Sequence, residues 1–174
     1  MDKSYPTTAW TQIFTDGSAE NATRNGGCGI YTRQPNKPPI TLAIPGGDLC
    51  SNYRAEAQAL LIATETVTQL ETRPNKVVLL TDPHIWSAIT RIRKSTGRLH
   101  LTKCNTKFKQ PDIKNNSLTS MDTSHTGIYG NKVVNQLAKE GSKKQQPKSK
   151  LSYQEAKTLI RNKRLADFKH INGG

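Results

Sequence analysis

The stretch Ile13-Phe14-Thr15-Asp16-Gly17-Ser18 decides the fold prediction, and Asp16 is its most informative residue. A run of β type from Trp10 to Phe14 precedes Asp16, and a glycine turn is expected directly after it. A carboxylate at a strand end is held rigidly and still faces solvent, which suits an ion of fixed geometry such as Mg²⁺. Asp-Gly is also a common turn dipeptide, so this stretch alone favours an ordinary turn.

The first part of the chain predicts an antiparallel meander. Beyond the first strand, Gly27–Thr32 and Ile40–Ile44 have the composition of two more strands. The segment 35–39 between them contains three prolines, which no helix could accommodate. Three successive strands with short links are typical of an antiparallel sheet.

The middle of the chain alternates between helical and strand patterns. Ser51 is placed to cap a helix running to about Leu70, in which apolar residues recur at helical spacing. The apolar run Val77–Leu80 predicts a strand buried on both faces, ending at Asp82, and Pro83 is placed in the first turn of a following helix. The fold class predicted is therefore α/β with a mixed sheet.

The C-terminal third divides into a polar stretch, a short helix and a basic tail. Residues 103–117 show no period, so a loop or a poorly specified strand is expected there, and residues 131–140 predict a short helix. Ser152 and Glu155 have the spacing of a capping box that opens a basic amphipathic helix to about Phe168. We expect a main domain over 1–142, a basic linker over 143–150 and a helical tail over 151–174.

The net charge of +13 is concentrated in two segments. Residues 91–114 hold eight Lys/Arg against one Asp/Glu, and residues 141–174 hold nine against two. A near-neutral body with two basic segments indicates a polyanionic partner, although basic segments exposed to solvent would look the same. An acidic membrane fits less well, because no strongly apolar face accompanies the charge.

Cysteine use and the N-terminus indicate an intracellular protein, cytoplasmic or nuclear. The isolated chain is expected to be a monomer. Cys28, Cys50 and Cys104 are odd in number, far apart and lack zinc-binding spacing, so reduced thiols are expected. The first residues lack a signal peptide, and no apolar run approaches the length of a membrane span.

Three carboxylates stand at positions that could form one site: Asp16, Glu56 early in the predicted helix, and Asp82. In a mixed sheet the two Asp-bearing strands can be neighbours, and a covering helix can bring Glu56 over them. Such a cluster repels itself unless cations bind, and its oxygen ligands suit Mg²⁺ or Mn²⁺. Two such ions about 4 Å apart can support phosphodiester hydrolysis. A turn residue, an exposed helix charge and a helix cap remain the open alternatives for Asp16, Glu56 and Asp82 respectively.

Four motifs resemble those of type-1 ribonuclease H domains. Their residues are most similar to the ribonuclease H domains in polyproteins of non-LTR retrotransposons, which also carry a reverse transcriptase. The motifs are Thr15-Asp16-Gly17-Ser18, Ser51-Asn52-Tyr53-Arg54-Ala55-Glu56, Thr81-Asp82 and Ser124-His125-Thr126-Gly127-Ile128-Tyr129-Gly130-Asn131. The tail from Leu151 to Lys157 also resembles the segment after such domains. The resemblance implies a five-stranded mixed sheet flanked by helices, two divalent ions, and cleavage of the RNA strand in RNA–DNA hybrids.

By this resemblance Asp16, Glu56 and Asp82 match three of the four metal-binding carboxylates of the family. Asn135 stands at the fourth position, where an amide oxygen can ligate but brings no negative charge, and Lys132 replaces a usual Glu. Weaker metal binding and reduced activity are therefore expected. His125 matches a loop histidine that acts near the leaving group, in a loop whose preceding residues depart from the family pattern.

The resemblance also implies contacts with nucleic acid. Asn52 matches a residue that contacts the hybrid, and the basic segment after the second helix can grip phosphates without sequence specificity. Its candidates are Arg91, Arg93, Lys94 and Arg98. Two further hypotheses remain open: a catalytically inactive module that only binds nucleic acid, and a transposon remnant that folds poorly.

Overall fold

The structure is a computed structural model that describes residues 5–70, 76–82, 117–121 and 129–172 of the 174-residue chain. The helix predicted after Pro83 lies outside the described residues, as does most of the stretch 103–117.

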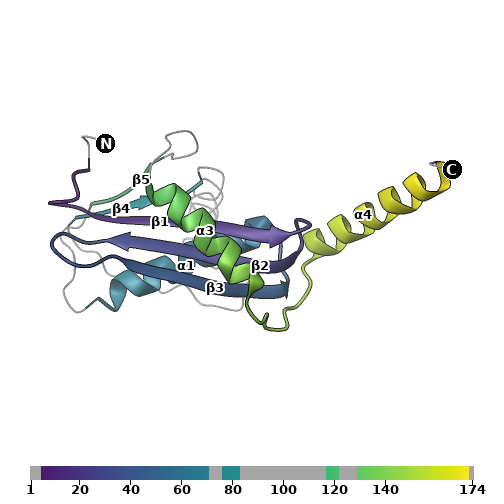
Figure 1. Ribbon diagram of the computed structural model, residues 1–174, viewed down its shortest axis with the longest axis horizontal. Helices are drawn as coiled ribbons and strands as arrows, with labels where there is room; N and C mark the ends of the chain where they lie inside the picture. The colour runs from purple at the N-terminus through teal and green to yellow at the C-terminus, as the bar shows by residue number, and fades with distance from the viewer. Residues whose placement is uncertain (1–4, 71–75, 83–116, 122–128, 173–174) are drawn as a thin grey trace, which may run out of the picture.

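A mixed β-sheet forms the centre of the molecule (Figure 1), with the strand order β3-β2-β1-β4-β5. The strands are β1 (Thr11–Glu20), β2 (Arg24–Arg33), β3 (Ile40–Leu49), β4 (Lys76–Leu80) and β5 (Ser117–Met121). The first three pair antiparallel, whereas β1 with β4 and β4 with β5 pair parallel. The predicted fold class, α/β with an antiparallel meander followed by parallel strands, is confirmed.

The first strand is longer than predicted, and its predicted end at the Asp16-Gly17 turn is wrong. β1 continues to Glu20 because β2 continues beside it: Asp16 pairs with Gly29 and Gly17 pairs with Cys28. The chain turns only after Glu20, where Asn21 and Ala22 adopt positive φ angles of 47° and 65°. Asp16 is therefore held inside a paired strand rather than at a strand end.

Helix α1 (Asn52–Thr68) covers one face of the sheet. Its start agrees with the prediction, because the Ser51 hydroxyl accepts a hydrogen bond from the Arg54 N–H at 3.3 Å. Small residues along the helix pack against larger side chains of the sheet, so the helix lies close to the strands: Ala55, Ala59 and Ala63 meet Ile13, Ile30 and Leu79 in one buried cluster. The Cys28 thiol, within this cluster, donates to the Ala55 carbonyl at 3.3 Å, as expected of a reduced cysteine.

Helix α3 (Tyr129–Lys143) crosses the opposite face (Figure 1) and is longer than the predicted 131–140. Its Val134 is buried with Phe14 and Val78. The helix lies almost on the backbone of β2, where a Cβ on Gly29 would stand 2.2 Å from the Val134 carbonyl oxygen. Glycine in β2 therefore fixes how closely α3 approaches the sheet.

Residues 144–152, hereafter the strap, run back along the end of β3 before α4 (Tyr153–Asn172) begins. The N–H of Asp48 donates to the Pro147 carbonyl at 3.0 Å, and the N–H of Leu49 donates to the Ser149 hydroxyl at 3.0 Å. Beyond the strap, α4 projects away from the rest of the molecule (Figure 1). No helix of the described residues has the length and apolar character needed to cross a membrane.

The predicted capping box at the start of α4 is present, and it also reaches α1. Glu155 accepts a hydrogen bond from the Ser152 N–H at 2.9 Å, while the Ser152 hydroxyl accepts one from the Glu155 N–H at 3.3 Å. The other oxygen of Glu155 accepts the N–H of Ser51 at 3.0 Å, and Arg54 pairs with the carboxylate at 3.3 Å. A single carboxylate, 1% exposed, thus joins the N-termini of both helices.

Candidate active site

Asp16 lies on the α3 side of the sheet and is fixed by two hydrogen bonds. Its Oδ1 accepts the N–H of Gly17 at 2.8 Å, and its Oδ2 accepts the side-chain amide of Asn135 at 3.1 Å. Burial raises the pKa of Asp16, as does the nearby charge of Asp82, while the two hydrogen bonds and the Lys139 charge oppose that rise. The carboxylate is thus partly desolvated and short of positive charge.

Glu56 reaches the same region from the first turns of α1. The residue that permits this is Gly17, because a Cβ on it would lie 2.2 Å from the backbone nitrogen of Glu56. Gly17 therefore serves close packing of the helix on β1 rather than a turn. The Asp16-Gly17 dipeptide, which predicts a turn from sequence, instead marks a close approach of helix and strand.

The three predicted carboxylates lie close enough to affect one another. Burial raises the pKa of Glu56 to about 7, and the charges of Asp82 and Asp16 add to that rise. Asp82 is half-buried and follows the end of β4 by two residues, and β4 is the parallel neighbour of β1. Two neighbouring parallel strands thus bring Asp16 and Asp82 near Glu56 of α1.

The donor set fits a hard divalent cation. Buried carboxylates that repel one another lose that energetic penalty when a cation neutralises them, and carboxylate oxygens are the ligands that Mg²⁺ and Mn²⁺ prefer. Among the described residues, no three His, Cys, Asp or Glu side chains already stand close enough to hold an ion together. The carboxylates would therefore have to draw closer around a bound ion.

Asn135 occupies the predicted fourth position, on α3 beside Asp16. Its amide nitrogen donates to Oδ2 of Asp16, one of the two carboxylate oxygens that could ligate an ion. Lys139, one helical turn further along α3, adds a positive charge that lowers the pKa of Asp16. Lys139 is not among the predicted site residues, although its spacing of four residues from Asn135 puts both on one helix face. Lys132 is exposed on the same helix.

Of the remaining predicted site residues, the structure describes only Asn52. Asn52 is exposed at the first position of α1, and the capping role there belongs to Ser51. The loop histidine and the basic segment lie outside the described residues: His125, Arg91, Arg93, Lys94 and Arg98.

Comparison of the sequence with known families identifies the family of this chain. The sequence model of the RNase H family matches residues 8–143. Among solved structures, the chain is similar to RNase H1 from the halophilic archaeon Halobacterium salinarum, with 14% identity and a TM-score of 0.48 over 76% of this chain and 96% of the other. No curated protein matches the chain. With a family match over most of its length, the chain belongs to the ribonuclease H family.

Proposed function

We propose that this protein is a metal-dependent endonuclease that hydrolyses the RNA strand of RNA–DNA hybrids, with reduced activity. The observation that carries the proposal is the gathering of Asp16, Glu56 and Asp82, where burial, with the charges of Asp82 and Asp16 adding to its effect, raises the pKa of Glu56 to about 7. Carboxylates that gather at one place with perturbed pKa values are typical of a functional site.

Asp16, Glu56 and Asp82 would hold two Mg²⁺ or Mn²⁺ ions. Such ions, when bound, activate a water molecule and stabilise the departing oxygen of a phosphodiester. Asn135 would offer an amide oxygen in place of a fourth carboxylate, after its side chain turns from its present hydrogen bond. Because Asn135 brings no negative charge, and because Lys139 stands nearby, the metal affinity and the cleavage rate would be lower than in a site with a fourth carboxylate. By resemblance, His125 would assist departure of the product strand.

The finer parts of the proposal rest on sequence resemblance. The motifs around Asp16, Glu56 and His125 support an origin in a non-LTR retrotransposon. The basic segments support binding of an RNA–DNA hybrid or another nucleic acid, with Asn52 and the 91–98 residues contacting it. We propose an intracellular, monomeric protein, cytoplasmic or nuclear.

A second candidate function is a binding module without catalysis. The specific observation in its favour is the hydrogen bond from Asn135 to Asp16, which places an amide donor where a metal ion would otherwise be coordinated. Such a module would bind hybrid with steep salt dependence and leave it intact.

Incubation of the purified protein with an end-labelled hybrid, in Mg²⁺ or Mn²⁺, separates the two. The nuclease predicts shortened RNA products that vanish in the Asp16→Asn variant, which serves as the blank. Absence of cleavage at high protein concentration, with the Asn135→Asp variant also silent, would exclude the nuclease, and salt-dependent binding of the intact hybrid would then identify the binding module.

A further inference from the structure

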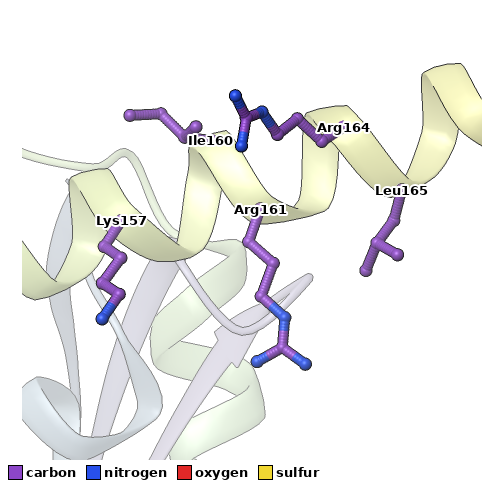
Figure 2. Close-up of a pocket in the computed structure, with 5 residues that line it drawn as sticks. All are labelled: Lys157, Ile160, Arg161, Arg164 and Leu165. Atoms are coloured by element: carbon purple, nitrogen blue, oxygen red, sulfur yellow. The ribbon is translucent and has the colours of Figure 1, made fainter.

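Helix α4 carries an exposed stripe that nothing in the described structure covers. Figure 2 shows its members along successive turns of the helix, and we call them the α4 stripe: Lys157, Ile160, Arg161, Arg164 and Leu165. Their spacing puts them on one side of the helix, where a globular protein normally buries apolar residues. Here Ile160 is 60% exposed and Leu165 is 51% exposed, so this side is available to a partner.

The charge of the stripe indicates which partner it fits. Residues 156–165 contain four basic side chains, all exposed, and no acidic one. The acidic residue that precedes them, Glu155, is buried and already paired with Arg54. A second copy of this chain would bring an identical basic stripe against the first, and the like charges would repel. A polyanion is the complementary partner.

The position of α4 is fixed where it meets the domain. Glu155 binds the backbone N–H groups of both Ser51 and Ser152, so α4 begins beside the N-terminus of α1. That same end of α1 carries exposed Asn52 and, one turn on, Glu56 of the candidate active site. The 20 residues of α4 span about 30 Å, close to the length of one duplex turn.

We propose that α4 is an arm that binds the phosphate backbone of a nucleic-acid duplex outside the candidate active site. Lys157, Arg161 and Arg164 contact the phosphates, and the anchor at Glu155 directs the arm along the duplex that enters the site. The contacts add affinity without sequence preference. This inference rests on the proposed function, since the duplex is the hybrid substrate.

The test measures binding of a fluorescent hybrid by anisotropy, in EDTA so that no cleavage occurs, over a range of salt concentrations. The arm variant is Arg161→Gln with Arg164→Gln. Its matched control, Arg33→Gln with Lys37→Gln, also removes two positive charges but lies at the β2–β3 turn, at the far end of the sheet from α4 (Figure 1). Each protein is measured on a hybrid of about 24 base pairs and on one of about 8.

On the long hybrid we expect the arm variant to bind about tenfold more weakly at low salt, with a salt slope smaller by about two. The control variant should bind the long hybrid as tightly as the parent chain does. On the short hybrid, the affinities of the parent chain and the arm variant should differ much less. Equal binding of the long hybrid by parent and arm variant would overturn the arm while leaving hybrid cleavage untouched. Failure of the parent chain to bind any hybrid would instead count against the proposed function.

A second measurement tests whether a second copy of this chain, rather than nucleic acid, binds the α4 stripe. Sedimentation of the parent chain without nucleic acid should show a single monomeric species. A dimer that Ile160→Glu with Leu165→Glu converts to monomer would mean that the stripe holds a second copy, and the proposal would be wrong. A monomer in both proteins supports it.

Discussion

The side-chain amide of Asn135 donates a hydrogen bond to Oδ2 of Asp16 over 3.1 Å, joining α3 to β1. This hydrogen bond lowers the pKa of Asp16 and so favours its ionised form. A bound metal ion would favour the ionised form as well, through its positive charge. An amide donor and a cation compete for the same carboxylate oxygen. If the chain is the nuclease proposed above, we expect its cleavage rate to depend on how readily the Asn135 side chain turns away from Asp16.

Replacement of Asn135 by Asp should raise cleavage of an RNA–DNA hybrid by about tenfold or more, because a negative charge restores attraction for divalent ions. The Mg²⁺ concentration needed for half-maximal cleavage should fall as well. Gln145→Glu adds a similar charge at an exposed residue beyond α3 and serves as the control. An Asn135→Asp chain with unchanged metal dependence would show that this position does not contact the ions.

Stability in the absence of divalent ions should fall as pH rises through the range in which Glu56 ionises. The pKa of Glu56 is raised from 4.5 to about 7 in the folded chain, so between these values the folded state holds more protons than the unfolded state. The contribution is full below about pH 4.5 and lost above about pH 7, and we expect it to be on the order of 1 kcal/mol because solvent screens a partly exposed group.

Chemical denaturation in EDTA at pH 5 and pH 8 measures this effect. The Glu56→Gln variant should show a smaller loss of stability between the two, with the remainder partly due to Asp16, whose pKa is also raised. Adding Mg²⁺ should stabilise the parent chain more at pH 8 than at pH 5, since protons and cations compete for the carboxylates. Parallel pH profiles for parent and variant would contradict the assignment of Glu56.

Loss of the Glu155 charge should destabilise the whole domain, even though Glu155 lies outside the family match. Glu155→Gln keeps the size of the side chain but removes the ion pair with Arg54 and weakens the caps of two helices. We expect a loss of about 1–3 kcal/mol, measured by urea denaturation. Glu140→Gln, at an exposed position of α3, should change the stability by less than about 0.5 kcal/mol.

The pH dependence of this contact runs opposite to that of Glu56. Burial alone would raise the pKa of Glu155, but hydrogen bonds from Ser152 and Ser51 and the Arg54 charge lower it below its usual value. Its stabilisation is thus present above the unfolded-state pKa and is lost as pH falls through the folded value. A Glu155→Gln penalty that stayed constant down to the lowest accessible pH would argue against the ion pair.

Gly17→Ala should impair both folding and cleavage, because the added methyl group would meet the backbone of α1 at Glu56. Overpacking against backbone costs about 1–3 kcal/mol and would displace Glu56 from Asp16. Gly46→Ala is the milder comparison, since its nearest contacts, to the Gln58 side chain and the Gly26 backbone, are both 3.1 Å away, against 2.2 Å at Gly17. Thermal melts and the hybrid assay would measure the two effects, and equal behaviour of both variants would exclude a special role for Gly17.

Much of the fold could be predicted from local patterns. The meander, the Ser51 cap, the apolar run of β4 and the capping box at Ser152 each depend on residues close together in sequence. The pairing of Asp16 with Gly29 could not be predicted in this way, because it joins residues of two strands. Nor does any local pattern mark the glycines of β2 as the place where α3 packs on the sheet.

The candidate site was predictable as a set of residues but not as a set of contacts. The positions of Asp16, Glu56 and Asp82 follow from the strands and the helix that were predicted around them. The hydrogen bond between Asn135 and Asp16 depends instead on where α3 lies along β1, which no local pattern gives. The link from Glu155 to Ser51 joins residues 104 apart, and no periodicity in either segment indicates it.

The strap also affects how the protein behaves in solution. β3 is the last strand on its side of the sheet, and such an edge offers open backbone groups to any other extended chain. The strap occupies part of that edge, through Pro147 and Ser149, and Lys144 donates to the Ala43 carbonyl at 2.6 Å. A chain cut at residue 143 would keep every candidate catalytic residue yet expose a strand edge prone to aggregation.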